Sequence, residues 1–213
     1  MTSFPPLIHV VDDDAPFRTA MARLLRACGY QVVLYESTTK FLEMPRGSGC
    51  GCLLLDVRMP GLSGLELQNR LAARGYSLPI VFITGYGDIP MTVQAMKAGA
   101  EDFLCKPISK AKLLEVVQRA LLRSEAEREQ HDRLSQLRAL VTTLTPRESE
   151  VFARVIRGKL NKQIAHELGA SERTIKAHRH NVMHKLQVRS IAELVSMANR
   201  LNAPTARASG GTT

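Results

Sequence analysis

Short apolar runs alternate with amphipathic segments over the first 122 residues, and this alternation limits the fold more than any other feature. Five runs have the length and apolar character of buried strands. They lie at Leu7–Val11, Gln31–Tyr35, Cys52–Leu55, Ile80–Ile83 and Asp102–Cys105. Segments with helical spacing fill the intervals. The pattern therefore predicts a doubly wound α/β fold, in which helices cover both faces of a five-stranded parallel sheet.

Four of these runs end in residues that can carry charge or donate a hydrogen bond. The runs read LIHVVDD, CLLLD, IVFIT and DFLCK, and they end at Asp12-Asp13, Asp56, Thr84 and Lys106. Right-handed crossovers place the carboxyl ends of parallel strands at one edge of the sheet, where such folds bind ligands. The sequence therefore predicts that these five side chains gather at that edge.

Three carboxylates with a hydroxyl and an ammonium group suit phosphoryl transfer, which needs an in-line nucleophile and neutralised equatorial oxygens. We predict that Asp56 is the phosphoacceptor, because it ends the middle strand. The predicted ligands of Mg²⁺ or Mn²⁺ are Asp12, Asp13, Asp56 and the backbone carbonyl of Arg58. Thr84 and Lys106 are predicted to contact phosphoryl oxygens. Asp14 precedes Ala15-Pro16 and is predicted to cap a helix rather than to bind metal.

The rest of the chain divides into three predicted parts. Residues 123–141 contain no Gly or Pro and carry charges of both signs, which predicts a solvated linker helix. A dimerising helix is the alternative, since Leu134, Leu137 and Val141 recur at rough helical spacing. Residues 142–202 hold four short helical segments, the first announced by the capping pattern Thr145-Pro146-Arg147-Glu148. Residues 203–213 are predicted to be disordered.

Most of the net charge of +9 lies in the C-terminal third. Residues 1–122 carry +2, whereas residues 142–213 carry +7, so a polyanion is the natural partner of the second part. A helix over Glu172–Leu186 would present a basic face that is free of bulky apolar groups, and such a helix can lie in a DNA major groove. The predicted DNA-binding residues are Lys162, Arg173, Thr174, Lys176, Ala177, Arg179 and His180. Of these, Lys176, Ala177 and His180 are predicted to reach bases, and Lys162, Arg173 and Arg179 to reach phosphates.

Both parts resemble known bacterial families. The motifs VVDDD, LLLDVRMPGLSG, FITGYGD and AMKAGAEDFLCKP resemble, in sequence and order, the receiver domain of two-component response regulators. Residues 144–201 resemble the LuxR-type helix-turn-helix. The whole chain is similar to the FixJ/NarL class, above all to its FixJ and StyR-like branch. This resemblance implies a flavodoxin-like (CheY-like) sheet of order 2-1-3-4-5 and a cis peptide between Lys106 and Pro107.

The resemblance also implies a function, namely a transcription factor that a sensor histidine kinase phosphorylates on Asp56. Phosphorylation would favour a homodimer through the face 89–106 and promoter binding, with RNA polymerase as a further partner and activation as the outcome. Thr84 would move toward the phosphoryl group and Phe103 would turn inward, helped by a pliant loop at residues 85–87; a plain core role for Phe103 is the alternative. The last helix, with Ile191, Leu194, Val195 and Ala198, resembles a dimerisation helix; core packing is its alternative.

Other functions fit the sequence less well. A phosphatase that works through an aspartyl-phosphate would carry a second acid two residues beyond Asp56, where this chain has Arg58, and a cap insertion that it lacks. We therefore expect no enzyme activity beyond the protein's own phosphotransfer and dephosphorylation. A receiver that dimerises without a signal would not need Thr84 and Lys106 together.

Location and redox chemistry follow from two further observations. No apolar run approaches the length of a membrane span and the first residues lack signal-peptide features, so a cytoplasmic protein without a membrane partner is expected. Cys50 and Cys52 are the one close cysteine pair, and we interpret the four cysteines as reduced structural thiols rather than a metal or redox site.

Overall fold

The structure is a computed structural model that describes residues 6–44, 50–85 and 89–202. Its residues group into two compact units, Met1–Glu129 and Gln130–Thr213. The predicted disorder of residues 203–213 and the predicted pliancy of Tyr86 and Gly87 concern positions outside the described residues. Among the described residues, no helix combines the length and the apolar character that a membrane crossing requires.

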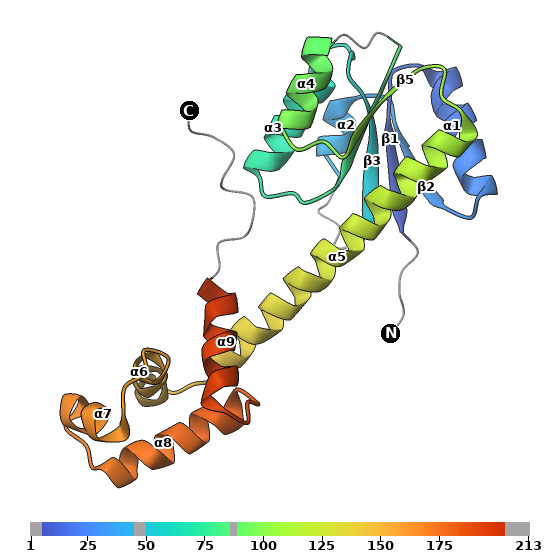
Figure 1. Cartoon of the computed structure of the whole chain (residues 1–213). Coiled ribbons are helices and arrows are strands. Elements are labelled where there is room, and N and C mark those ends of the chain that lie inside the picture. Colours follow the sequence, from blue (N-terminus) through green and yellow to red (C-terminus); the bar gives the residue numbers. More distant parts are fainter. Residues whose placement is uncertain (1–5, 45–49, 86–88, 203–213) are drawn as a thin grey trace. The chain divides into compact units, whose positions relative to one another are not determined.

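The first unit contains the predicted five-stranded parallel sheet (Figure 1). Its strands are β1 (Leu7–Val11), β2 (Gln31–Tyr35), β3 (Gly51–Asp56), β4 (Ile80–Thr84) and β5 (Asp102–Cys105). They follow the order β2-β1-β3-β4-β5, which confirms the predicted topology. Asp56 and Thr84 are the last residues of their strands, and Lys106 directly follows β5. The sheet therefore delivers these functional groups to one edge.

Helices cover both faces of this sheet (Figure 1). They are α1 (Ala15–Ala27), α2 (Thr38–Leu42), α3 (Gly64–Ala73), α4 (Ile89–Lys97) and α5 (Lys110–Thr142). One apolar core joins α1 and α5 to the sheet and includes Leu25, Leu54 and Val117. A second core joins α2, α3 and α4 to the opposite face and includes Leu55 and Phe82. All-buried strands such as β3 and β4 are the expected result of covering a parallel sheet twice.

The second unit is a small helical domain. Its short helices are α6 (Pro146–Val155), α7 (Asn161–Leu168), α8 (Glu172–Lys185) and α9 (Ile191–Asn202). The predicted capping box at the start of α6 is present, since Thr145 accepts from the Glu148 amide and Glu148 accepts from the Thr145 amide. The apolar core of this unit includes Val151, Ile164 and Ile175, each 0% exposed. It fixes which face of each helix points outward.

Helix α5 is continuous through the segment predicted to be a linker. Near residue 124 it still belongs to the first unit, because the Gly51 amide donates to the buried Ser124 hydroxyl over 3.1 Å. Near its end, Leu137, Leu140 and Val141 pack against the core of the second unit. Of the three residues that suggested a dimerising helix, Leu137 and Val141 contribute to this core, whereas Leu134 does not belong to it.

The four cysteines are free thiols. Burial raises the pKa of Cys52 to about 12, which keeps this thiol protonated and unreactive at neutral pH. The predicted structural role therefore suits Cys52.

Candidate functional site

The predicted acidic residues and their partners meet at the carboxyl edge of the sheet. Asp12 is 1% exposed, Asp56 8% and Thr84 1%, whereas the neighbouring Asp13 is exposed. Buried polar groups at this density require partners, because an unpaired buried charge is costly. The local contacts show how the protein supplies those partners.

Backbone amides hold the two buried carboxylates in place. The Asp14 amide donates to Asp12 Oδ1 over 2.8 Å, and the Arg58 amide donates to Asp56 Oδ1 over 3.0 Å. The start of α3 also presses closely on this site. A Cβ atom on Gly64 would lie 2.3 Å from the carbonyl oxygen of Asp56, so only glycine fits there. Each carboxylate thus has one oxygen fixed and the other directed to the cluster.

Lys106 joins the two buried carboxylates. Its Nζ donates to Asp12 Oδ2 over 2.7 Å and to Asp56 Oδ2 over 3.1 Å. Burial alone would lower the pKa of Lys106, but its hydrogen bonds and the charges of the two carboxylates outweigh burial and raise it. For Asp12, burial raises the pKa, and the Lys106 hydrogen bond offsets only part of that rise. The ammonium group is therefore a permanent positive charge within the cluster.

The carboxylate oxygens also have the arrangement of a cation site. Asp12, Asp13 and Asp56 each offer one oxygen, and these oxygens lie within 4.8 Å of one another. Hard oxygen donors that keep one side open to solvent are what Mg²⁺ prefers, since this ion retains several waters. The residues present therefore fit a small divalent cation. Asp14 acts as the predicted helix cap, because its side chain accepts from the Phe17 amide over 3.1 Å.

Two residues of α1 take part in this site although the sequence analysis did not select them. The Lys106 Nζ lies 3.8 Å from the centre of the Phe17 ring. Arg18 Nη1 donates to the backbone carbonyl of Asp12 over 2.5 Å. The available signal was positional: both follow the Asp14 cap within one turn, so they start the helix at the same sheet edge.

Thr84 and Phe103 lie on the adjoining strands. The Lys106 amide donates to the Thr84 carbonyl over 2.8 Å, which ties the end of β5 to the end of β4. The Lys106-Pro107 peptide is cis, as the resemblance implied. Phe103 is partly buried and packs against Phe82, with ring centroids 6.1 Å apart. Core packing is thus one role of Phe103, and its switch role stays a prediction.

The second unit presents the predicted basic face on α8. Ile175, Val182 and Leu186 point into the core and are at most 2% exposed. The outward residues are Arg173, Thr174, Lys176, Ala177, His180 and His184, all exposed. Ser171 caps the helix by accepting from the Thr174 amide over 3.1 Å. The helix thus separates an apolar inner face from a basic outer one.

Two other predicted DNA-binding residues lie near the start of α7. Lys162 is exposed. Arg179 is only partly exposed, because its Nη1 donates to Asn161 Oδ1 over 2.5 Å. This bond links α8 to the amino end of α7, so Arg179 orients two helices besides any contact with phosphate. The sequence analysis also passed over Asn181, which is exposed one turn beyond Ala177.

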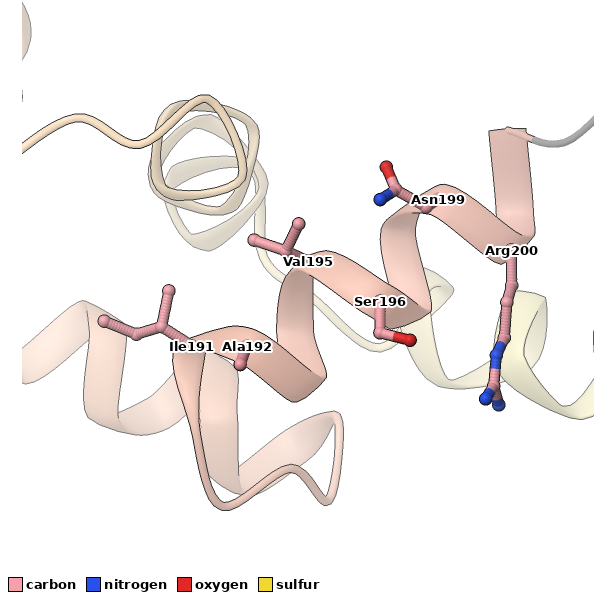
Figure 2. A pocket seen from close by; sticks show the side chains of 6 residues that line it. All are labelled: Ile191, Ala192, Val195, Ser196, Asn199 and Arg200. Carbon is pink, nitrogen blue, oxygen red and sulfur yellow. The ribbon is translucent and has the colours of Figure 1, made fainter.

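Helix α9 has two faces with different surroundings. Leu194 and Ala198 are 1% and 4% exposed and belong to the core. Figure 2 shows the other face, an open hollow to which α9 alone contributes among the described residues. Its lining residues are Ile191, Ala192, Val195, Ser196, Asn199 and Arg200. Of the four residues predicted for a dimerisation helix, two are therefore core residues and two, Ile191 and Val195, line the open face.

Comparisons with known proteins agree with both parts of the chain. The family model described as the response regulator receiver domain matches residues 8–118. The model described as bacterial regulatory proteins of the luxR family matches residues 142–198.

Individual relatives match nearly the whole chain. The response regulator protein TmoT of Ectopseudomonas mendocina is 45% identical over 92% of this chain and 89% of its own length. The transcriptional regulatory protein FixJ of Bradyrhizobium diazoefficiens is 42% identical over 91% of this chain and 94% of its own. A solved structure of the response regulator StyR is 48% identical, covers 92% of this chain and 100% of its own, and has a TM-score of 0.82.

Proposed function

Because this chain belongs to the response regulators that join a receiver domain to a LuxR-type DNA-binding domain, in the FixJ and StyR-like branch, we propose that phosphorylation of Asp56 controls its binding to promoter DNA. Membership in this family makes the protein a transcription regulator with a kinase and promoter DNA as partners. The phosphoryl chemistry, the dimer and the direction of regulation are our proposals. One observation carries them: the carboxylates of Asp12, Asp13 and Asp56 converge, and the Lys106 ammonium bridges Asp12 and Asp56.

In the proposed reaction, a carboxylate oxygen of Asp56 attacks the phosphorus atom of a phosphohistidine on the sensor kinase. An O–P bond forms as the N–P bond breaks, and the imidazole leaves with the electron pair of that bond. Asp56 suits this step because the Arg58 amide fixes one of its oxygens and leaves the other in the cluster. The product is an aspartyl-phosphate on this protein.

The charges around Asp56 must neutralise the incoming group. Asp12, Asp13, Asp56 and the carbonyl of Arg58 would hold Mg²⁺ or Mn²⁺, which when bound offsets negative charge on the phosphoryl oxygens. Lys106 already lies 3.1 Å from Asp56 Oδ2, so its ammonium can contact a phosphoryl oxygen on that atom after a small movement. The Thr84 hydroxyl, at the end of the adjacent strand, would contact another. Loss of the group by hydrolysis would reset the protein.

The phosphorylated site would change the neighbouring surface. In our proposal Thr84 moves toward the phosphoryl group and Phe103 turns inward, which alters the face made by α4 and β5. This face has the exposed apolar residues of a contact surface, since Ile89, Val93 and Met96 are 81%, 44% and 44% exposed. Burying them between two copies would favour a homodimer.

Dimerisation would in turn favour DNA binding. Two copies present two α8 helices, and the second contact with DNA becomes effectively intramolecular. Lys176, Ala177 and His180 would contact bases, while Lys162, Arg173, Thr174 and Arg179 would contact the backbone. The open face of α9, with Ile191 and Val195, is a second candidate contact between copies. We propose activation of transcription, with RNA polymerase as the partner, in the cytoplasm.

The test combines phosphorylation with association. Purified protein is treated with acetyl phosphate and Mg²⁺, and intact mass spectrometry and sedimentation velocity are recorded together. We expect one added phosphoryl group and a shift from monomer to dimer, and we expect Asp56→Asn to lose both while keeping its circular dichroism spectrum. Addition of the group at a site other than Asp56, or an unchanged shift in Asp56→Asn, would refute the proposal.

A further inference from the structure

We propose that Phe17 is a positioning residue of the phosphoryl site, whose ring face holds the Lys106 ammonium while that group changes its anionic partner. This inference rests on the proposed function of Asp56 and goes beyond it, because Phe17 carries no charge and makes no hydrogen bond through its side chain. Its role would be to keep a cation in reach of the phosphoryl oxygens.

The contacts around Lys106 come from three directions. Two are the carboxylate oxygens of Asp12 and Asp56, at 2.7 Å and 3.1 Å. The third is the face of the Phe17 ring, whose centre lies 3.8 Å from Nζ. This distance is well inside the range in which the negative face of an aromatic ring attracts an ammonium group. The Lys106 side chain is 21% exposed, so solvent screens these contacts only in part.

The ring itself is firmly placed. Phe17 lies in the first turn of α1, where its amide donates to the Asp14 cap over 3.1 Å. Its side chain packs against the core that joins α1 and α5 to the sheet. The adjacent Arg18 ties this turn to the Asp12 carbonyl over 2.5 Å. The ring is therefore anchored beside the acidic cluster by contacts that do not involve Asp56.

An aromatic face has an advantage over a third carboxylate in this place. When Asp56 gains a phosphoryl group, Lys106 must exchange part of its bond to the carboxylate for one to a phosphoryl oxygen. A further acidic side chain would compete for the same N–H donors and would repel the phosphoryl group. The ring attracts the ammonium without accepting a directional hydrogen bond from one of its N–H donors, and it adds no net negative charge. It also covers one side of the ammonium with an apolar surface, which lowers local screening.

Matched substitutions separate the ring face from the volume of the side chain. Phe17→Leu keeps an apolar group of similar size but has no aromatic face, whereas Phe17→Tyr keeps the face. The probe is beryllofluoride with Mg²⁺, which forms a stable mimic of the aspartyl-phosphate. Its binding is measured by ¹⁹F NMR and calorimetry on the full chain, and Mg²⁺ alone is titrated in parallel. Neither readout depends on a kinase.

We expect Phe17→Leu to bind beryllofluoride roughly three- to tenfold more weakly than the wild-type chain, with Phe17→Tyr close to wild type. Mg²⁺ affinity should stay within about twofold in both variants, because the ring contacts Lys106, which is not among the proposed metal ligands. Equal beryllofluoride binding by Phe17→Leu and wild type would overturn the inference. So would a parallel loss in Phe17→Tyr, or an equal loss of Mg²⁺ affinity, since either indicates general damage to the site.

The outcome for the wild-type chain keeps this inference distinct from the proposed function. If the wild-type protein takes up no beryllofluoride, the phosphoryl function of Asp56 fails and the role of Phe17 fails with it. If it does take up beryllofluoride and Phe17→Leu matches it, the role of Phe17 alone fails.

Discussion

At the carboxyl edge of the sheet, Asp12, Asp56 and Thr84 are buried, whereas on α8 the side chains of Arg173, Lys176 and His180 stand in solvent. The side chains at the sheet edge are held by hydrogen bonds to one another, such as those that Lys106 donates to the two carboxylates. On α8, packing against the core holds the inner face, whereas these three outer side chains extend into solvent.

This difference predicts what each surface responds to. A preorganised buried cluster depends on the ion and the charges that complete it, and it is little affected by ionic strength. An exposed basic face depends on the release of counterions from DNA, so it is governed by salt. The chain is therefore predicted to carry one metal-dependent and one salt-dependent surface, and the following measurements can separate them.

Removal of divalent metal should have the largest effect. With EDTA, we expect the chain to gain no phosphoryl group from acetyl phosphate, because the three carboxylates would repel the donor. Mg²⁺ or Mn²⁺ should restore labelling, as measured by intact mass. In the same samples, binding of the unphosphorylated chain to a DNA duplex at low salt should not change. Labelling that persists in EDTA would contradict the prediction that the sheet edge depends on a divalent metal.

Acidification should weaken the first unit through His9. His9 is 5% exposed, its Nδ1 lies 3.1 Å from the Tyr35 hydroxyl, and burial lowers its pKa from 6.5 to about 4. Between these values the unfolded chain binds a proton that folded His9 does not. The stabilisation that depends on neutral His9 should therefore be fully present above pH 6.5. As the pH drops toward 4, the free energy of unfolding should fall by up to about 3 kcal/mol.

Tyrosine fluorescence gives the measurement for this prediction. The chain has no tryptophan, and its four tyrosines all precede residue 130, so urea unfolding followed by this signal reports on the first unit. His9→Gln is the control, since it removes the titrating ring and should flatten the profile between pH 6.5 and 5. A profile of equal slope in this variant would assign the pH dependence to other groups.

Substitution of Lys176 should have an intermediate effect. If its ammonium reaches a guanine, Lys176→Ala should cost about 1–3 kcal/mol of binding to a preferred duplex and relax the choice of base at one position. Selection from a random duplex library with the phosphorylated protein supplies the preferred site, and fluorescence anisotropy gives the affinities. An equal loss of affinity for preferred and random duplexes would show that Lys176 contacts phosphate rather than a base.

Substitution of Lys162 should have the smallest effect, and the same assay can detect it. This exposed side chain at the start of α7 is expected to contact phosphate. Lys162→Ala should weaken preferred and random duplexes alike and lower the slope of log affinity against log salt by about 1. A change in base preference would show instead that Lys162 reads sequence.

The sequence predicted the fold and the sheet edge well for a physical reason. Charged residues directly after apolar runs have few places to go in a parallel sheet, so Asp12, Asp56 and Lys106 had to meet. The inner face of α8 was equally predictable, since Ile175, Val182 and Leu186 share a helical face. Both predictions follow from periodicity and strand direction, which are local properties.

What the sequence did not predict depends on contacts between distant elements. Phe17 is an ordinary apolar residue until β5 brings Lys106 over its ring. The bond of Arg179 to Asn161 needs the packing of α8 on α7, so the sequence alone suggested only a phosphate contact. Likewise, Leu137 looked like part of a short stripe on a solvated helix, and only the fold shows the core that it joins.

Because α5 contributes residues to the cores of both units, its length limits where the two units can be cut and joined to other proteins. A fusion that took the first part only to residue 122 would discard Ser124, the hydroxyl partner of the Gly51 amide. A fusion that began the second part at residue 142 would discard Leu137, Leu140 and Val141 from its core. A crossover between residues 128 and 136 keeps these contacts, and it also keeps the ion pair of Arg123 with Glu127. Such a junction suits the exchange of either unit, in evolution or in a designed biosensor.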